Sequence, residues 1–315
     1  MPLRPLQILQ AALALCLLIT LYQCTTPGTP SSQLEAKVQP PSQLTPPNTE
    51  IFIPKTIHQL LLSMPGHPVS AFHPTSHSIS WQQSGWKVEY WSEAACAQLA
   101  HDADPDAVRG YAAAFRRFPS AVLRSDFCRY LILFVRGGVY NDLDVRLVRG
   151  LPWGVMLGSH SGETLPPAVI IGMEGDASTT GLPRSPQFVQ WTMVSTPGHP
   201  IFEGVLRRIV ERTDAYLRQW EEDPGADVNV MDWTGPSVWT DAVLEYLDCD
   251  EAMLRTLQDL KETVRIKDVV VLPKRGFAIT QGEDHSSPDV LVKHYFSGTW
   301  KTTDCRAWWR WIGRC

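Results

Sequence analysis

Two carboxylates, Asp142 and Asp144, follow an apolar run and two glycines in the stretch "RSDFCRYLILFVRGGVYNDLDV", residues 124–145. In an extended chain, residues at positions i and i+2 project to the same side. Two carboxylates on one side form a dense oxygen site for Mn²⁺ or Mg²⁺, hard ions that keep coordination positions open for substrate phosphates. An Asn-Asp turn after a strand is also common, so the pair alone leaves both a metal site and a polar turn open.

Asp126 and Arg129 precede this pair on a helix that the sequence predicts from Pro119 to about Arg136, because apolar residues recur there at helical spacing. Residues three apart share a helix face, so one interpretation is a surface ion pair worth a few tenths of a kcal/mol. The glycines at 137–138 end the helix and turn it back toward the Asp pair. We therefore expect Asp126 and Arg129 beside the same cleft, where Asp accepts from sugar hydroxyls and Arg binds phosphate or sugar oxygens.

A third segment, "VLVKHYFSGTWK" from Val290 to Lys301, combines a histidine, a glycine and a lysine. His294 offers an imidazole nitrogen as a third metal ligand, although a single histidine is more often structural. Gly298 lets backbone N–H groups approach a phosphate closely, and Lys301 adds a positive charge. The spacing favours a diphosphate site but does not decide the matter.

Five segments occur in the order found in glycosyltransferase family 32, and together they cover essentially Ile51 to Lys301. The chain most resembles the fungal initiation-specific α-1,6-mannosyltransferases of that family, because "TGPSVWTDAV", "VVVLP" and "VKHYFSGTWK" follow that subgroup's pattern. The S-D-x-x-R-Y segment combined with the D-x-D pair is the most specific part of the resemblance. The five segments are "IPKTIHQ" (53–59), "SDFCRY" (125–130), "GGVYNDLD" (137–144), "TGPSVWTDAV" (234–243) and "VKHYFSGTW" (292–300).

The resemblance implies an α/β GT-A-type nucleotide-sugar-binding fold, with a mixed central sheet flanked by helices. It also implies a nucleotide-sugar donor, Mn²⁺ (or Mg²⁺) as cofactor and retention of the anomeric configuration. Asp144 is then the expected direct metal ligand, with Asp142 on the metal or the donor's ribose and His294 as the C-terminal ligand. The implied catalytic residues are Asp142, Asp144, Asp126 and Arg129, and the implied donor-binding residues are Asp126, Arg129, Tyr130, Gly138, Asp142, Gly298, Lys301 and Leu61.

Leu61 departs from the family pattern, since many relatives read "IHQIW" where this chain reads "IHQLL" at residues 57–61. In related toxins that Trp stacks on the nucleotide base, so the resemblance leaves the donor's base open, with GDP-mannose favoured. The subgroup implies α-1,6 transfer of mannose onto a glycan in N-glycan outer-chain synthesis. Two alternatives stay open: transfer to inositol-phosphoceramide or another glycolipid, and a Golgi-anchored sugar-binding pseudoenzyme without catalysis.

The elements that must position these residues alternate between helix and strand, which predicts an α/β domain. Strand patterns occupy residues 51–53, 86–91, 139–140 and 264–273, and helix patterns occupy 92–102, 199–220 and 238–247. Residues 234–236 look like a tight turn that lines the donor or acceptor cleft. Loop residues that could reach an acceptor, or equally be surface or packing residues, are Glu174, Asp176, His199, Asp232 and Trp233.

The N-terminal stretch has no charged residue between Arg4 and Glu35, and residues 6–22 are apolar enough for a membrane-spanning helix. A cleaved signal peptide is the competing interpretation, but no small-x-small cleavage site follows the apolar run. We expect a cytosolic tail at 1–5, a signal anchor at 6–22, a Pro/Ser/Thr-rich stem at 23–50 and a luminal catalytic domain at 51–315. This layout is that of a single-pass type II Golgi membrane protein, for which a Golgi enzyme complex is a candidate partner.

The composition is that of a globular protein, with 44% hydrophobic and 19% charged residues. A formal net charge of −5 gives no reason to expect a nucleic-acid partner. The seven cysteines include no C-x-x-C spacing, which argues against a structural zinc site, and their pairing cannot be read from sequence. The twelve tryptophans offer flat faces for sugar stacking, although buried core positions are commoner.

Overall fold

The computed structural model describes residues 52–62, 74–151, 167–175, 181–222 and 229–296. Residues Met1–Asn48 form one unit and Thr49–Cys315 a second, and everything described below belongs to the second. The predicted tail, anchor and stem, together with Gly298 and Lys301, lie outside the described residues. Within the described ranges, no helix is both long enough and apolar enough to cross a membrane.

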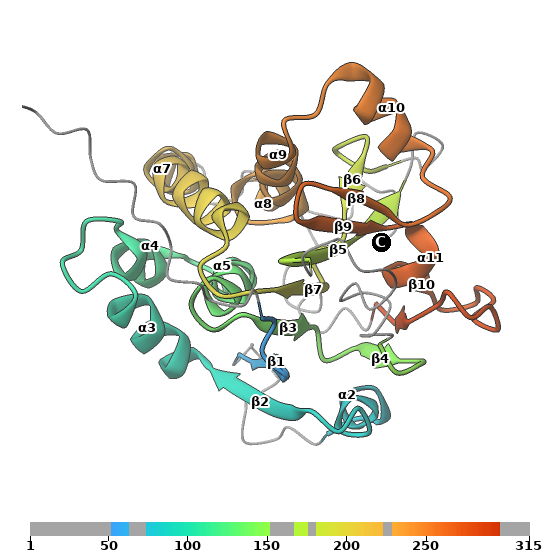
Figure 1. Cartoon of the computed structure of the whole chain (residues 1–315). Coiled ribbons are helices and arrows are strands. Elements are labelled where there is room, and N and C mark those ends of the chain that lie inside the picture. The colour runs from blue at the N-terminus through green and yellow to red at the C-terminus, as the bar shows by residue number, and fades with distance from the viewer. Residues whose placement is uncertain (1–51, 63–73, 152–166, 176–180, 223–228, 297–315) are drawn as a thin grey trace, which may run out of the picture. The chain divides into compact units, whose positions relative to one another are not determined.

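A mixed sheet of eight strands forms the centre of the domain (Figure 1). Its strands run in the order β2-β1-β3-β7-β5-β9-β8, with β6 paired onto β5. Strand β1 is parallel to β2 and β3, and β5 is parallel to β9, whereas β7 runs antiparallel to both β3 and β5. The strands are β1 (Thr56–Leu61), β2 (Lys87–Ser92), β3 (Gly138–Asn141), β5 (Val169–Gly175), β6 (Gln187–Phe188), β7 (Thr192–Ser195), β8 (Val264–Ile266) and β9 (Val269–Leu272).

Helices cover both faces of this sheet, so the predicted α/β class with a flanked mixed sheet is confirmed (Figure 1). Each face has its own apolar core, and each large side chain buried there contributes roughly 1.5–3 kcal/mol. The larger core lies under α3 (Glu93–Asp102), α4 (Tyr111–Arg117), α5 (Ala121–Arg136), α7 (Pro200–Glu222), α8 (Val230–Trp233), α9 (Pro236–Leu247) and α10 (Glu251–Gln258). The smaller core lies under α2 (Ser76–Gln82) and α11 (Lys274–Phe277).

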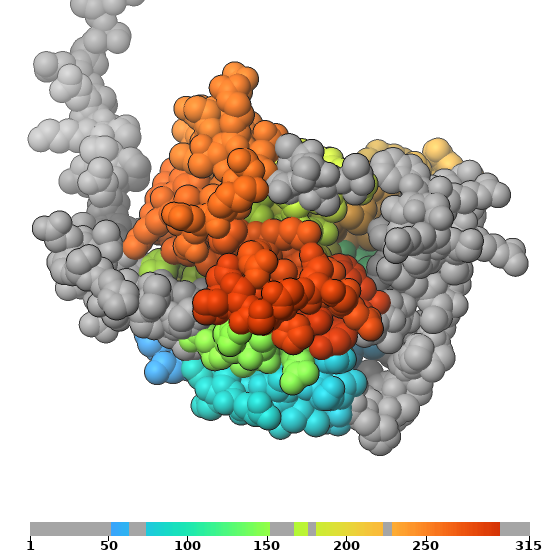
Figure 2. Space-filling view, turned by 90° about the vertical axis from the view of Figure 1, so that its right-hand side faces the viewer, coloured from blue at the N-terminus to red at the C-terminus, as the bar shows by residue number. Residues whose placement is uncertain are grey.

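A second, three-stranded sheet lies beside α2 and joins segments that are far apart in the sequence. It consists of β10 (Ile279–Thr280), β11 (Val292–His294) and β4 (Val145–Leu147), and β11 runs antiparallel to β4. Helix α2 is fixed to β4 by two hydrogen bonds, from Trp81 Nε1 to the carbonyl oxygen of Val145 (2.8 Å) and from the Leu147 amide to Ser80 Oγ (2.9 Å). Figure 2 shows the red C-terminal surface lying directly against the green of the β4 region, with cyan below it.

Most predicted elements are confirmed, but two strands differ from the sequence patterns. The strand expected at 51–53 instead begins beyond Pro54, at Thr56, because proline has no N–H to donate to a ladder. The run 264–273 is two antiparallel strands rather than one, since Lys267 adopts a left-handed conformation (φ 55°) and reverses the chain. The predicted turn at 234–236 is confirmed as the junction between α8 and α9, with Pro236 in the first turn of α9.

Helix α5 carries Asp126 and Arg129, and a double-glycine turn joins it to β3. Gly137 caps the helix with φ 64°, and Gly138 follows with φ 88°, both in the left-handed region. A Cβ atom on Gly138 would lie 2.5 Å from the carbonyl oxygen of Thr56, and one on Gly137 would lie 2.8 Å from that of Ser195. The two glycines therefore allow α5 to fold back tightly against the sheet, as the sequence predicted.

His58 on β1 fixes this turn from inside the protein. Its Nδ1 accepts a hydrogen bond from Trp91 Nε1 (3.0 Å), so the proton resides on Nε2, which donates to the carbonyl oxygen of Gly137 (3.0 Å). The side chain is 1% exposed, and this burial lowers the pKa of His58 to about 4, against the opposing charge of Glu89. His58 is thus a neutral bridge that holds β2, β1 and the glycine turn together.

We predict that His58 makes folding sensitive to acid. Between pH 6.5 and pH 4 the unfolded chain takes up a proton on His58 that the folded chain resists, so stability falls as the pH falls. This pKa shift lowers the free energy of unfolding by about 3 kcal/mol between pH 6.5 and pH 4. Urea unfolding at several pH values should show a shallower acid loss for His58→Gln than for wild type. An exposed control, His101→Gln, should keep the wild-type slope, and an unchanged slope in His58→Gln would contradict the prediction.

A disulfide between Cys96 and Cys128 joins α3 to α5. Both residues are 0% exposed, and Cys128 lies one position before Arg129, so the bond fixes the helix that carries the candidate site residues. Among the described cysteines, Cys249 is unpaired and partly exposed. The bond closes a loop with a sequence separation of 32 residues.

We predict that removing this disulfide destabilises the domain. In the chain-entropy model, a loop of this size is worth roughly 3 to 4 kcal/mol, so a Cys96→Ala, Cys128→Ala double variant should melt well below wild type. Cys249→Ala provides the control and should melt like wild type. Thiol titration of the native protein adds an independent check, because reactive thiols at positions 96 and 128 would contradict the assignment.

Candidate active site

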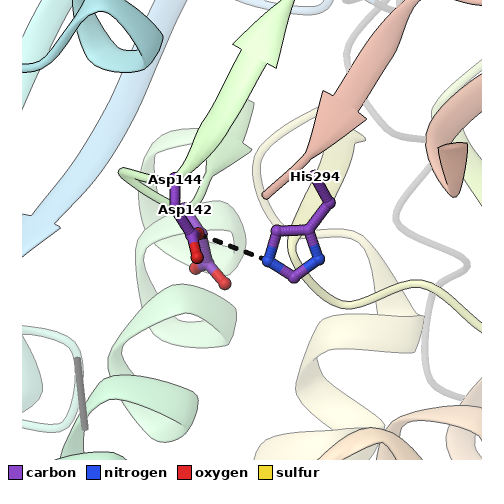
Figure 3. Close-up of side chains that lie close together, drawn as sticks. All are labelled: Asp142, Asp144 and His294. Atoms are coloured by element: carbon purple, nitrogen blue, oxygen red, sulfur yellow. Dashed lines mark ion pairs between the residues drawn. The ribbon is translucent and has the colours of Figure 1, made fainter. Parts of the chain in front are cut away.

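Asp142, Asp144 and His294 lie close together at the junction of the two sheets (Figure 3). One potential ligand atom from each side chain lies within 4.8 Å of the others, and His294 Nε2 is 3.3 Å from Asp144 Oδ1. The pairing of β11 with β4 places His294 opposite Val145, and the Tyr295 amide donates to the carbonyl oxygen of Asp144 (3.0 Å). The predicted cluster of two carboxylates and one imidazole is therefore present, across a long sequence separation.

The two carboxylates converge through a turn and not through strand alternation. Strand β3 ends at Asn141, and the Val145 amide donates to the carbonyl oxygen of Asp142 (3.1 Å), which closes a turn over residues 142–145. The polar-turn alternative is therefore confirmed, and this turn brings Asp142 and Asp144 together. Metal binding by the pair stays a prediction. The expectation that an extended backbone would align them was wrong in its geometry.

Arg129 is the centre of the charge network beneath this cluster. Its guanidinium lies 3.1 Å from Asp126 Oδ1 and 3.3 Å from Asp142 Oδ1, and it donates to the carbonyl oxygen of Gln190 (3.2 Å). The Arg129 side chain is 7% exposed, so the alternative of a surface ion pair is wrong. A buried guanidinium with two carboxylate partners binds α5 to the Asp142 turn.

Asp126 lies deeper than the sequence suggested, with the residue only 2% exposed. Oδ1 faces Arg129, and Oδ2 accepts a hydrogen bond from Thr234 Oγ1 (3.0 Å) at the start of the "TGPSVWTDAV" segment. Burial raises the pKa of Asp126 to about 7, and the charge of Arg129 opposes that rise. Both carboxylate oxygens have protein partners, so the structure shows Asp126 positioning Arg129. Direct contact with a donor sugar stays a prediction.

Asp142 is crowded by polar groups. The Tyr140 hydroxyl donates to Asp142 Oδ1 (2.5 Å), and the Tyr140 ring also faces the Arg129 guanidinium, 5.0 Å from its centroid. Burial raises the pKa of Asp142, Arg129 opposes the rise, and the nearby charge of Asp144 adds to it. Asp142 therefore has protein partners on both sides, and its side chain (25% exposed) is about as accessible as that of Asp144 (22%). The assignment of Asp144 as the direct metal ligand stays a prediction.

The residues fit a divalent cation. Two carboxylates held close together repel each other, and a cation between them removes that cost. Carboxylate oxygens with one imidazole nitrogen form a donor set that Mn²⁺ accepts, and oxygen-rich sites of this kind also suit Mg²⁺. His294 Nε2 faces the carboxylates, while its Nδ1 is buried with no hydrogen-bond partner among the described residues.

The remaining predicted donor-binding residues occupy different surroundings. Tyr130 is 0% exposed, stacks on Trp239 and donates from its hydroxyl to Gln190 Oε1 (2.7 Å), which places it in the core beside Arg129. Gly138 acts through the turn described above, and Leu61 is half-buried at the end of β1. Their contacts with a donor stay predictions.

The residues considered for acceptor contact have protein partners. Trp233 is fully buried, His199 lies 3.3 Å from Asp268, and Asp232 pairs with Arg184. Glu174 on β5 accepts a hydrogen bond from Gln187 (2.7 Å), and burial raises its pKa to about 7. Asp176 lies outside the described residues.

Sequence reasoning missed three contributors. Tyr140 and Thr234 lie inside segments already singled out, but an ordinary buried hydroxyl gave no signal that each would bond a site carboxylate. His77 on α2 lies in no motif, yet its ring stacks on Tyr295 with centroids 3.9 Å apart, next to His294. Only tertiary structure reveals these three contacts.

Residues 71–162 match the family described as "Glycosyltransferase sugar-binding region containing DXD motif". This segment of the chain is similar to a glycosyltransferase sugar-binding region, and it includes the D-x-D sequence at Asp142 and Asp144.

More particularly, the chain is 31% identical over 205 residues to the initiation-specific alpha-1,6-mannosyltransferase of Schizosaccharomyces pombe, covering 60% of this chain and 49% of that protein. It is also 31% identical over 223 residues to the enzyme of the same name from Candida albicans, covering 60% and 57%. The chain spans about half the length of these relatives. The resemblance predicted from the five segments is confirmed. The PaToxG glycosyltransferase structure aligns with a TM-score of 0.41 and 18% identity, over 65% of this chain and 74% of that one.

We predict that Arg129→Met strongly destabilises the domain. The change leaves Asp126 and Asp142 without their shared cation, and breaking a buried pair typically costs about 3–5 kcal/mol. Arg136→Met, at the exposed end of the same helix, is the matched control and should unfold close to wild type. Equal denaturant midpoints for Arg129→Met and wild type would contradict a structural role for the network.

Proposed function

We propose that the protein is a retaining glycosyltransferase that moves a hexose from a nucleotide sugar onto a glycan acceptor. The favoured reaction is transfer of mannose from GDP-mannose in α-1,6 linkage, in N-glycan outer-chain synthesis. The proposal depends mainly on one observation, which is that Asp142 and Asp144, within the matched segment 71–162, lie close to His294 from a distant part of the chain. The names of the fungal relatives, both alpha-1,6-mannosyltransferases, support mannose as the sugar.

Asp142, Asp144 and His294 would hold Mn²⁺ or Mg²⁺. When bound, such an ion supplies Lewis-acid stabilisation for the negative charge of a departing nucleoside diphosphate. The positive charge of Arg129 offsets the negative charge of Asp142, and the ion pair between them holds the Asp142 side chain in place. Because the network is buried and already bonded, little reorganisation is needed when charge develops at the donor.

Retention of configuration is assigned to attack by the acceptor hydroxyl on the same face from which the diphosphate leaves. A double displacement would need a carboxylate nucleophile near the sugar carbon, and the sequence does not identify one. Asp126 has both oxygens bonded within the protein, which argues against that role for it. The donor sugar would develop oxocarbenium character as its bond to the diphosphate oxygen breaks. The acceptor oxygen would form the new glycosidic bond, and the hydroxyl proton would pass to the departing diphosphate oxygen.

We further propose a luminal catalytic domain in the Golgi, held by a signal anchor at residues 6–22. The disulfide between Cys96 and Cys128 supports an oxidising compartment, since such bonds are rare in the cytosol. The apolar N-terminal stretch supports the anchor.

We predict that Asp144→Asn abolishes Mn²⁺ binding and lowers sugar transfer roughly 10³-fold while the domain stays folded. Activity is assayed with a panel of nucleotide sugars, including GDP-mannose, with and without a mannosyl glycan. Mn²⁺ affinity is measured by calorimetry, and folding by thermal melting. Asp102→Asn, an exposed change on α3, is the control. Near-normal turnover of Asp144→Asn in Mn²⁺ would refute the metal assignment, and no donor cleavage by wild type with any nucleotide sugar would favour the pseudoenzyme.

A further inference from the structure

His77 on α2 lies against Tyr295 and close enough to Asp144 for the charge of that carboxylate to act on it. His77, Ser80 and Trp81 occupy positions i, i+3 and i+4, so they share one helix face. Ser80 and Trp81 bond to β4 at Leu147 and Val145, immediately after the Asp142 turn. The same face therefore carries His77 toward Asp144, whose charge acts on the pKa of the imidazole, although burial dominates and lowers that pKa.

The ring of His77 is held in a defined plane. It stacks on Tyr295 at 3.9 Å with an interplanar angle of 26°, and Tyr295 is fixed in turn by its amide bond to the Asp144 carbonyl. His77 Nδ1 is buried and has no hydrogen-bond partner among the described residues. Stacking alone would be satisfied by any aromatic ring, so a hydrogen-bonding role is what distinguishes histidine here.

Positive charge surrounds this ring on the side of the second sheet. Lys293 Nζ lies 5.7 Å from the Tyr295 ring centroid, and Arg146 stands opposite Lys293 in the β4–β11 register. Arg146 also acts electrostatically on His77. Positive charge therefore lies near His77 and its stacking partner Tyr295, which suits an anionic ligand beside these two rings.

We propose that His77 is a further substrate-binding residue, which donates a hydrogen bond from its imidazole to a phosphate oxygen of the nucleoside diphosphate. The inference rests on the proposed function, and it adds His77 to the residues that would bind the nucleoside diphosphate leaving group. Among the described residues, the close ligand group comprises Asp142, Asp144 and His294 and does not include His77, so we assign His77 to the phosphate and not to the metal. In the transfer step His77 makes no covalent bond and only stabilises the phosphate as the sugar–oxygen bond breaks.

The test measures GDP binding in the presence of Mn²⁺ by calorimetry, with UDP as a second probe. His77→Phe keeps a ring to stack on Tyr295 and removes the hydrogen bond, so the dissociation constant for GDP should rise about tenfold to a hundredfold. His77→Gln retains an N–H donor and should recover part of that loss. His101→Phe, a change at an exposed histidine on α3, should bind GDP like wild type.

Two further readouts separate binding from structure. The melting temperature and the affinity for Mn²⁺ alone should be unchanged in His77→Phe. The inference is overturned if His77→Phe binds GDP as wild type does, or if its loss of GDP binding is matched by a loss of Mn²⁺ affinity or of folding. If wild type itself binds neither GDP nor UDP with Mn²⁺, the proposed function fails and this inference fails with it.

Discussion

The guanidinium of Arg129 lies between two carboxylates in the interior, and the geometry of the site depends on that one charge. Removing such groups from water costs several kcal/mol per ion, which is recovered only when the partners are close and fully hydrogen-bonded. Arg129 has close partners in Asp126, Asp142 and a backbone carbonyl, while its Nε is buried with no hydrogen-bond partner among the described residues. A helix and a turn from different parts of the fold are thereby held in one fixed arrangement.

The parts around Arg129 form a continuous support. The disulfide at Cys128 fixes α5 to α3, and the two glycines turn the chain directly into β3. His58 holds that turn against β1 through the Gly137 carbonyl. The Asp142 turn therefore begins from a rigid base, which is what a metal-binding pair needs if its oxygens are to keep their spacing without a bound ion.

Local features of the site were predictable from the sequence, and long-range ones were not. Helix α5, its glycine end and the shared face of Asp126 and Arg129 follow from periodicity and backbone chemistry within about twenty residues. Burial of that pair does not, because it depends on Thr234 and Asp142 arriving from other elements. The spacing of His294, Gly298 and Lys301 made His294 a candidate ligand, and the family resemblance gave it the role of C-terminal ligand. The strand at 51–53 was misplaced because apolar content outweighed the missing N–H of Pro54 in the pattern.

The pairing of β11 with β4 has a consequence for the order of events during synthesis. Asp144 and His294 are separated by roughly 150 residues, so at ~5–20 residues per second the carboxylate pair leaves the ribosome about 8 to 30 s before its imidazole partner. Cys96 and Cys128 emerge close together and earlier, and α5 can be covalently fixed during that interval. The carboxylate pair is thus made well before its imidazole partner, and β11, the last strand among the described residues, brings His294 to it.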